Sequence, residues 1–349
     1  MTGRQPRHPG GALLLSGLAA GLAAVIVVSL GSGAVPISPG SVVGILLDHA
    51  GIDGGPSFTA RQDAVLWSIR LPRVLLGVLV GSGLGIAGAA LQGIFRNPLA
   101  DPQLIGISSG AALGSAVGIL GLEALIGSFA GPLGAFLGGI AAGVAVYSIA
   151  RNQGRTEVVT LVLAGIAVAA VGGAGAAFLS VVADDPRLGS ALFYSLGSLG
   201  VATWRLVAVT APVVLAAVLL LPLTARRLDL VLLGEREAGH LGVDVERLRI
   251  EVLLLATVAV SATVAAAGVI GFVGLIVPHA IRLVAGPGHR LLLPASAIGG
   301  ALLVVAADVM ARTVALPLEV PVGLLTAIVG GPVFLWLIRR TRREHGGWG

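Results

Sequence analysis

The feature that most constrains this chain is a series of long apolar runs, each about twenty residues between charged side chains, which is enough for a helix to cross the hydrocarbon of a bilayer. Such runs predict an all-α polytopic membrane protein of ten transmembrane helices. The expected spans are 11–34, 70–95, 103–121, 125–150, 157–182, 203–224, 250–268, 271–285, 290–311 and 321–340.

Composition supports a membrane location over a soluble helical core. Of the 349 residues, 56% are hydrophobic and 11% are charged, whereas a soluble domain carries about 25% charged residues. The 53 glycines and 18 prolines are tolerated in membrane helices, where small residues let backbones approach closely. We therefore expect one transmembrane domain over residues 1–349 in the cell inner (plasma) membrane.

The distribution of arginine orients the spans. With ten spans and a cytoplasmic N-terminus, 16 of the 22 basic residues fall on the inner side, as the positive-inside rule requires. The C-terminus is then cytoplasmic as well. This count depends on a break at Gly268 and Gly271, without which the parity changes. The alternative that the first run is a cleaved signal peptide would remove the first span.

Several kinds of chemistry are excluded by residue type. The chain has no cysteine, and all 22 basic residues are arginine, so thiolate sites, Schiff bases and a P-loop lysine are absent. ATP hydrolysis would have to come from another chain. The six histidines are too scattered to predict a metal site, and with 4% aromatic residues no nucleic-acid surface is indicated.

Two glycine patterns lie inside the second span. Gly77, Gly81 and Gly85 place a glycine on one helix face at every fourth residue, which is typical of close helix packing. The segment 83–88 also satisfies GxGxxG, but a dinucleotide site needs a strand before it and a helix after it. We therefore interpret both patterns as packing surfaces.

Two polar connections stand out between the spans. Residues 35–68 form an outer polar loop, and residues 225–249 form an inner one. In the inner segment, Glu235 and Glu237 occupy the first turn of a predicted short helix that ends near Gly239 and Gly242. Such a surface helix could seat a soluble partner, and the alternative is an ordinary cytoplasmic loop.

Asp308 is the acid that lies well inside a predicted span. An ionisable group at that depth is a functional hypothesis by default, for example a proton relay. Arg312 follows four residues later, in the orientation that favours an ion pair along a helix. We expect this neutralising pair, while a proton-coupled secondary carrier is the alternative function of another class, and a purely structural scaffold is a third.

Long motifs in order along nearly the whole chain resemble the FecCD-type permeases of bacterial importers for iron-siderophores, haem and cobalamin. The motifs are Arg70-Leu71-Pro72-Arg73, the stretch from Gln92 to Pro102, Gly106-Ile107-Ser108-Ser109-Gly110-Ala111, Leu233-Gly234-Glu235 with Leu241-Gly242, the stretch from Gly271 to His279, Pro321-Val322-Gly323 and Gly331-Pro332.

This resemblance implies a homodimer of ten-helix subunits, two ATP-binding-cassette ATPase subunits that use ATP and Mg, and a periplasmic or lipid-anchored binding protein. The permease itself would bind no cofactor. The residues implied in ATPase coupling are Leu233, Gly234, Glu235, Glu237, Ala238, Leu241 and Gly242. Arg70, Arg73 and Arg312 match outer-face arginines that dock the binding protein, a contact in which charge favours encounter and register.

The cargo is expected from a shorter resemblance. Residues 193–199 with Ala202-Thr203-Trp204 resemble the stretch that haem permeases carry after the fifth span, although Tyr194 stands where a tryptophan is expected. Haem is therefore the favoured cargo, with a ferric siderophore or cobalamin as alternatives. We expect Ser108, Ser109, Tyr194 and Ser198 along the translocation path.

Overall fold

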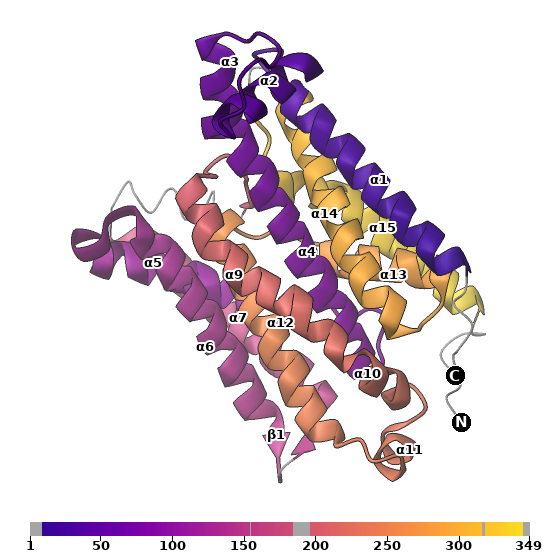
Figure 1. Ribbon diagram of the computed structural model, residues 1–349. Helices are drawn as coiled ribbons and strands as arrows, with labels where there is room; N and C mark the ends of the chain where they lie inside the picture. Colours follow the sequence, from indigo (N-terminus) through magenta and orange to yellow (C-terminus); the bar gives the residue numbers. More distant parts are fainter. Residues whose placement is uncertain (1–8, 154, 184–195, 316–317, 345–349) are drawn as a thin grey trace.

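A computed structural model describes residues 9–153, 155–183, 196–315 and 318–344. It is a bundle of long helices that lie side by side (Figure 1). They are α1 (Pro9–Gly31), α4 (Leu71–Ile94), α5 (Ile107–Ile126), α6 (Ala130–Ala150), α7 (Val158–Val182), α9 (Trp204–Leu220), α12 (Val245–Ala267), α13 (Val273–Ala285), α14 (His289–Thr313) and α15 (Val322–Glu344). A helix therefore lies at each of the ten expected spans.

Length and hydropathy separate these helices into two groups. Among the described residues, 7 helical stretches are long and apolar enough to cross a membrane, and one of them, 107–150, contains both α5 and α6. The other group consists of α13 and α15, whose apolar parts are shorter.

Short elements gather at the two ends of the bundle (Figure 1). One end, here the α2 end, carries α2 (Pro39–His49), α3 (Ala60–Val65) and a π-helix, η1 (Leu66–Arg70). The opposite end, the α11 end, carries α10 (Ala225–Val231), α11 (Glu235–His240) and the antiparallel pair β1 (Arg151–Asn152) and β2 (Arg155–Thr156). Three 3-10 turns complete the described elements: η2 (Pro102–Ile105), η3 (Gly127–Phe129) and η5 (Leu221–Thr224).

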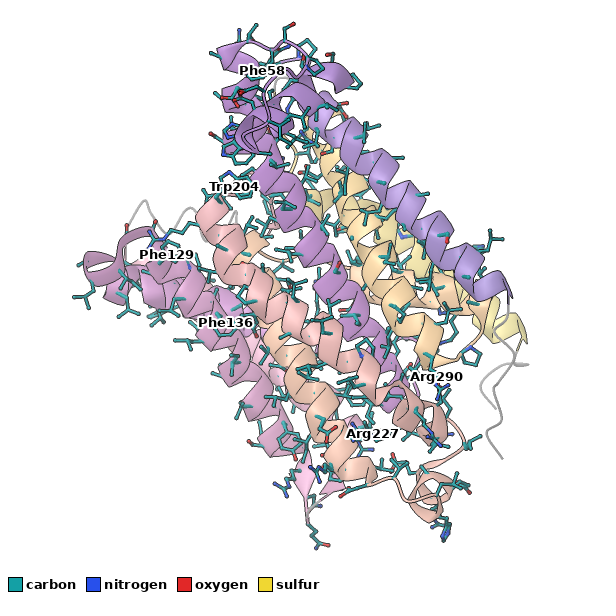
Figure 2. The ribbon with its side chains drawn as sticks, viewed as in Figure 1. Phe58, Phe129, Phe136, Trp204, Arg227 and Arg290 are labelled. Atoms are coloured by element: carbon teal, nitrogen blue, oxygen red, sulfur yellow. The ribbon has the colours of Figure 1, made fainter. Side chains whose placement is uncertain are left out.

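Figure 2 places Phe58 and Trp204 toward the α2 end and Arg227 and Arg290 at the α11 end. The start of α1 and the end of α15 lie at the α11 end as well (Figure 1).

Helix α4 is the buried centre of the bundle, and its glycine face explains how. A Cβ atom at Gly81 would lie 2.2 Å from the carbonyl oxygen of Gly300 in α14, and one at Gly88 would lie 1.9 Å from that of Gly274 in α13. Only glycine permits such backbone contact. The interpretation of both glycine patterns as packing surfaces is thus confirmed.

Helices α5 and α6 pack in the same way along their length. A Cβ at Gly114 would lie 2.2 Å from the Gly134 oxygen, and one at Gly118 would lie 2.2 Å from the Ala130 oxygen. Because the two backbones touch, this helix pair has no room for side chains between its glycine faces.

The outer connection 35–68 is more ordered than a loop. It contains α2 and α3, and both helices begin with a side-chain cap, from Ser38 and Thr59 respectively. His49 stacks on Trp67 with ring centroids 3.7 Å apart and pairs with Asp63 at 2.8 Å. The expected polar loop is thus wrong in detail, since capping residues and an aromatic contact fold it over the α2 end.

The expected break between α12 and α13 is present. Helix α12 ends at Ala267, and α13 begins at Val273. Gly268 and Phe272 have φ values of 70° and 66°, a region that a continuing right-handed helix does not use. Residues 268–272 are therefore a non-helical link inside the bundle.

Gly81→Ala tests the backbone contact between α4 and α14. The added methyl group has no space beside the Gly300 carbonyl, and overpacking of this kind costs about 1–3 kcal/mol or more. We expect a lower midpoint of thermal unfolding for the purified protein in detergent. Gly173→Ala is the matched control, because nothing lies within 4 Å of its Cβ position. Equal midpoints for the two variants would contradict the packing interpretation.

Candidate functional sites at the two ends of the bundle

At the α2 end, Arg70 closes the end of α1. Its guanidinium group donates to the carbonyl oxygen of Leu30 at 2.6 Å and also to that of Val35. These acceptors lie in and just beyond the last turn of α1, where carbonyls lack helical partners and the helix dipole is negative. Gly33, with φ 138°, leaves room for the guanidinium group. Arg70 is therefore a capping residue for another helix.

Arg312 reaches the same end of α1 from α14. Its Nη2 atom donates to the hydroxyl of Ser29 at 2.6 Å, and its Nη1 atom donates to the carbonyl of Ser32 at 3.5 Å. Its Nε lies 3.1 Å from Oδ2 of Asp308, which is the ion pair that the four-residue spacing predicts.

Arg73 of α4 completes a network that we call the α2-end ion cluster: the buried Arg73, Asp308 and Arg312 with the half-exposed Glu319. Arg73 Nε lies 2.9 Å from Oδ1 of Asp308, and its Nη1 lies 2.8 Å from Glu319. Both carboxylate oxygens of Asp308 are thus held by guanidinium groups. The sequence indicated the partner on the same helix but gave no signal for Arg73, which is 235 residues away in the chain.

The three arginines predicted to dock a binding protein are buried and already bonded within this chain. Arg70, Arg73 and Arg312 are 4%, 5% and 7% exposed. Their guanidinium groups are occupied by the end of α1 and by acids of the same chain, so they do not form an outer surface. Docking through them stays a prediction, and it requires the arginines to exchange these internal partners for those of another protein.

Gln92 of α4 bonds to α13, a helix that contains a proline. Pro278 has no N–H, which leaves the Gly274 carbonyl, four residues earlier in α13, without its helical donor. Gln92 Nε2 of α4 donates to the carbonyls of Gly274 and Leu275, both at 3.3 Å, while its Oε1 accepts from Arg282 at 2.9 Å. Gln92, a motif residue for which the sequence predicted no role, thus supplies the hydrogen-bond donor that Pro278 removes from α13.

The predicted path residues do not form one visible site. Ser108 is buried in the first turn of α5, and its hydroxyl has no hydrogen-bond partner. Ser109 is half-buried next to it, while Ser198 bonds to the end of α12 through its N–H, at 2.7 Å from the Ala267 oxygen. Tyr194 lies outside the described residues. Their role in transport stays a prediction.

Helix α7 exposes much of its apolar surface. Val159, Val171 and Val181 are 73%, 70% and 79% exposed. An apolar cavity of about 720 Å³ lies between α7, α5 and α6, beside the glycine-packed pair.

At the α11 end, the predicted short helix is present as α11. Glu235 and Glu237 lie in its first turn, and Ala238 is fully buried below it. Leu233 and Leu241, which flank the helix, are 63% and 59% exposed. Gly234 and Gly242 have φ values of 133° and 84°, which favour glycine. The segment therefore presents two leucines and two acids on a fixed surface helix.

Three ion pairs attach this segment to the long helices. Glu235 of α11 pairs with Arg249 of α12 at 2.6 Å, and Arg227 of α10 pairs with Glu251 of α12 at 2.6 Å. Asp229 of α10 accepts from the backbone N–H of His289 at 2.7 Å and pairs with its Nδ1 at 2.8 Å, at the start of α14. The segment is thus tied to two long helices rather than hanging as a loop.

Metal chemistry receives no support from side-chain clusters. Within 9–153, 155–183, 196–315 and 318–344, no group of three or more histidine, cysteine, aspartate or glutamate side chains could hold a metal ion. Asp63, Asp229, Glu235, Asp308 and Glu319 are instead paired with arginine or histidine.

The sequence matches the FecCD transport family over residues 21–340. This chain belongs to that family. It is 46% identical to the hemin transport system permease protein HmuU of Yersinia pestis over 297 residues. This alignment covers 83% of this chain and 88% of the relative. It is also 46% identical over 275 residues to the cobalamin import system permease protein BtuC of Halobacterium salinarum, covering 79% and 73% respectively.

A solved structure extends the likeness to the fold of this FecCD member. A metal-chelate type ABC transporter in an inward-facing conformation has a TM-score of 0.81 and 31% identity, covering 94% of this chain and 99% of the other. The expected all-α fold of a multi-pass permease is therefore confirmed. This similarity is between single subunits and concerns their fold.

Asp308→Ala tests the α2-end ion cluster. The substitution leaves Arg73 and Arg312 as buried charges without their shared carboxylate, a change that typically costs about 3–5 kcal/mol. We expect a marked fall in the midpoint of thermal unfolding in detergent. The control is Asp53→Ala at an exposed position of the same end. A midpoint unchanged from the parent protein would show that the cluster does not stabilise the fold.

Proposed function

We propose that this chain is the permease subunit of an ATP-binding-cassette importer that carries an iron chelate across the inner membrane, with haem as the cargo. The observation that carries the proposal is α11, a surface helix with exposed leucines and acids on a polytopic chain that has no lysine. Such a chain offers a docking face but no P-loop of its own.

The partners follow from this assignment. Two ATPase subunits would seat on the α11 end of a permease homodimer and supply ATP and Mg. A periplasmic or lipid-anchored binding protein would deliver the chelate at the α2 end. The exposed apolar face of α7 is consistent with further burial against a second copy or against membrane lipid. This chain needs no cofactor in the scheme.

The position of α11 also sets the orientation of the chain in the membrane. If α11 meets a cytoplasmic ATPase, then the start of α1 and the end of α15 are cytoplasmic too, because they lie at the α11 end (Figure 1). The arginine-rich inner segments then obey the positive-inside rule.

Haem, cobalamin and ferric citrate are cargoes of similar permeases, and the ferric dicitrate relative, FecD of Escherichia coli, is less identical to this chain, at 42%. The hemin permease and the cobalamin permease are equally identical to this chain, at 46%. The hemin relative matches more of the chain, 83% against 79%, and residues 193–199 resemble haem permeases as well. These two points favour haem.

A proton-coupled carrier is the rival class, and the state of Asp308 argues against it. Two guanidinium groups hold both oxygens of this carboxylate at 2.9 and 3.1 Å. A proton relay needs a carboxylate oxygen that is open to a proton donor or acceptor, whereas both oxygens here are already occupied by guanidinium groups.

Charge reversal on α11 tests the docking face. Glu235→Arg together with Glu237→Arg should prevent the ATPase subunit from copurifying with the permease, because the acids lie on the exposed docking surface. The permease itself should still insert and purify. Asp244→Arg is unsuitable as a control because Asp244 caps α12, so Asp48→Arg and Asp53→Arg at the α2 end serve instead. Copurification unaffected by the α11 change would reject the docking role.

The cargo assignment is tested with the reconstituted complex of permease, ATPase and binding protein in liposomes. We expect hemin to stimulate ATP hydrolysis several-fold, and cobalamin and ferric citrate to leave it near the basal rate. If cobalamin alone stimulates ATP hydrolysis, the cargo is cobalamin and not haem. Uptake that follows a pH gradient without ATP, and that is lost in Asp308→Asn, would instead select the proton-coupled carrier.

A further inference from the structure

Arg249 is a buried charge that the coupling assignment did not use. It lies in the second turn of α12 and is 3% exposed. Its Nη2 atom donates to Glu235 of α11 at 2.6 Å, and its Nη1 atom donates to Glu246 at 2.8 Å and to the carbonyl of Thr156 at 3.3 Å. One guanidinium group therefore contacts α11, α12 and β2.

The carbonyl, the backbone N–H and the hydroxyl of Thr156 are all hydrogen-bonded. Its carbonyl accepts from Arg249, while its N–H and its hydroxyl donate to the two oxygens of Glu246, the N–H at 3.2 Å. Thr156 is 6% exposed, so these bonds are shielded from water. Because Thr156 also pairs with Arg151, the two strands β1 and β2 are fixed to α12 through it.

Helix α11 has few other polar attachments. Among the described residues, Glu235 makes the one side-chain hydrogen bond that leaves α11 for another element. Ala238 is buried beneath the helix, and its carbonyl accepts from the N–H of Val243. The pair with Arg249 is therefore the side-chain link through which α11 contacts α12.

The geometry requires arginine and not simply a positive charge. A planar guanidinium group can serve three acceptors in fixed directions, whereas a lysine ammonium is a point charge on a flexible stem. Hydrogen bonds between charged groups are stronger than neutral ones, and removing one member of a buried pair leaves its partners uncompensated.

From these contacts we infer that Arg249 is a positioning residue that makes α11 and the β1–β2 hairpin move as one body. A displacement of α11 would then be passed through Arg249, Glu246 and Thr156 to the start of α7, which begins two residues after the hairpin at Val158. The inference rests on the proposed function, because it assigns the route by which a partner at α11 acts on the long helices.

The experiment uses the reconstituted importer and compares Arg249→Met with Arg247→Met. Arg247 lies on the same helix two residues earlier, but its side chain is 77% exposed and reaches Glu251 at 3.4 Å. Three quantities are measured for each variant: copurification of the ATPase subunit, ATP hydrolysis, and hemin taken up per ATP hydrolysed.

We expect Arg249→Met to keep the ATPase subunit bound and to keep basal hydrolysis, while uptake per ATP falls by about tenfold, within the range of measured coupling networks. Arg249→Lys should recover part of this loss. Thr156→Val, which removes only the hydroxyl bond, should give a smaller loss that does not add to that of Arg249→Met. Arg247→Met should behave like the parent protein.

Three results would overturn the inference: normal uptake per ATP in Arg249→Met, equal losses in the Arg247 and Arg249 variants, or additive losses for Arg249 and Thr156. If Arg249→Met fails to fold, Thr156→Val decides the question, and a normal ratio in that variant rejects the route. Glu237→Arg alone leaves the Glu235–Arg249 pair intact, so loss of ATPase copurification in that variant concerns docking alone. The two proposals are therefore tested by separate quantities.

Discussion

Carbonyl groups that lose their helical donors are the constraint on which this structure depends. In a bilayer no water can replace such a donor, so the protein must supply one. Here the end of α1 is closed by Arg70 and Arg312, and the carbonyl freed by Pro278 is taken up by Gln92. Each donor comes from a helix distant in sequence, so satisfying the backbone also fixes which helices are neighbours.

The glycine faces also determine which helices are neighbours. They bring backbones into contact, as between Gly81 and Gly300, while long charged side chains connect the same helices near their ends. Arg73 bridges such an end by pairing with Asp308 and Glu319. Close packing in the middle and ionic closure at the ends are thus two parts of one arrangement.

Much of the fold could be predicted because apolar runs and arginine-rich turns are local signals. The positions of the helices, the α12–α13 break and the short helix α11 all follow from residues that are close in sequence. The partners of Asp308 and Glu235 could be predicted only when they lie four residues away, as Arg312 does. Arg73 and Arg249 come from distant positions, and no local pattern in the sequence indicates that they are buried.

The link at residues 268–272 has a mechanical consequence. Helix α13 has 13 residues and rises about 20 Å, which is less than the thickness of the hydrocarbon layer. Residues 268–272, which precede α13, have no helical hydrogen-bond ladder to lock their torsions. A change in the tilt of α13 therefore need not be transmitted along the chain to α12.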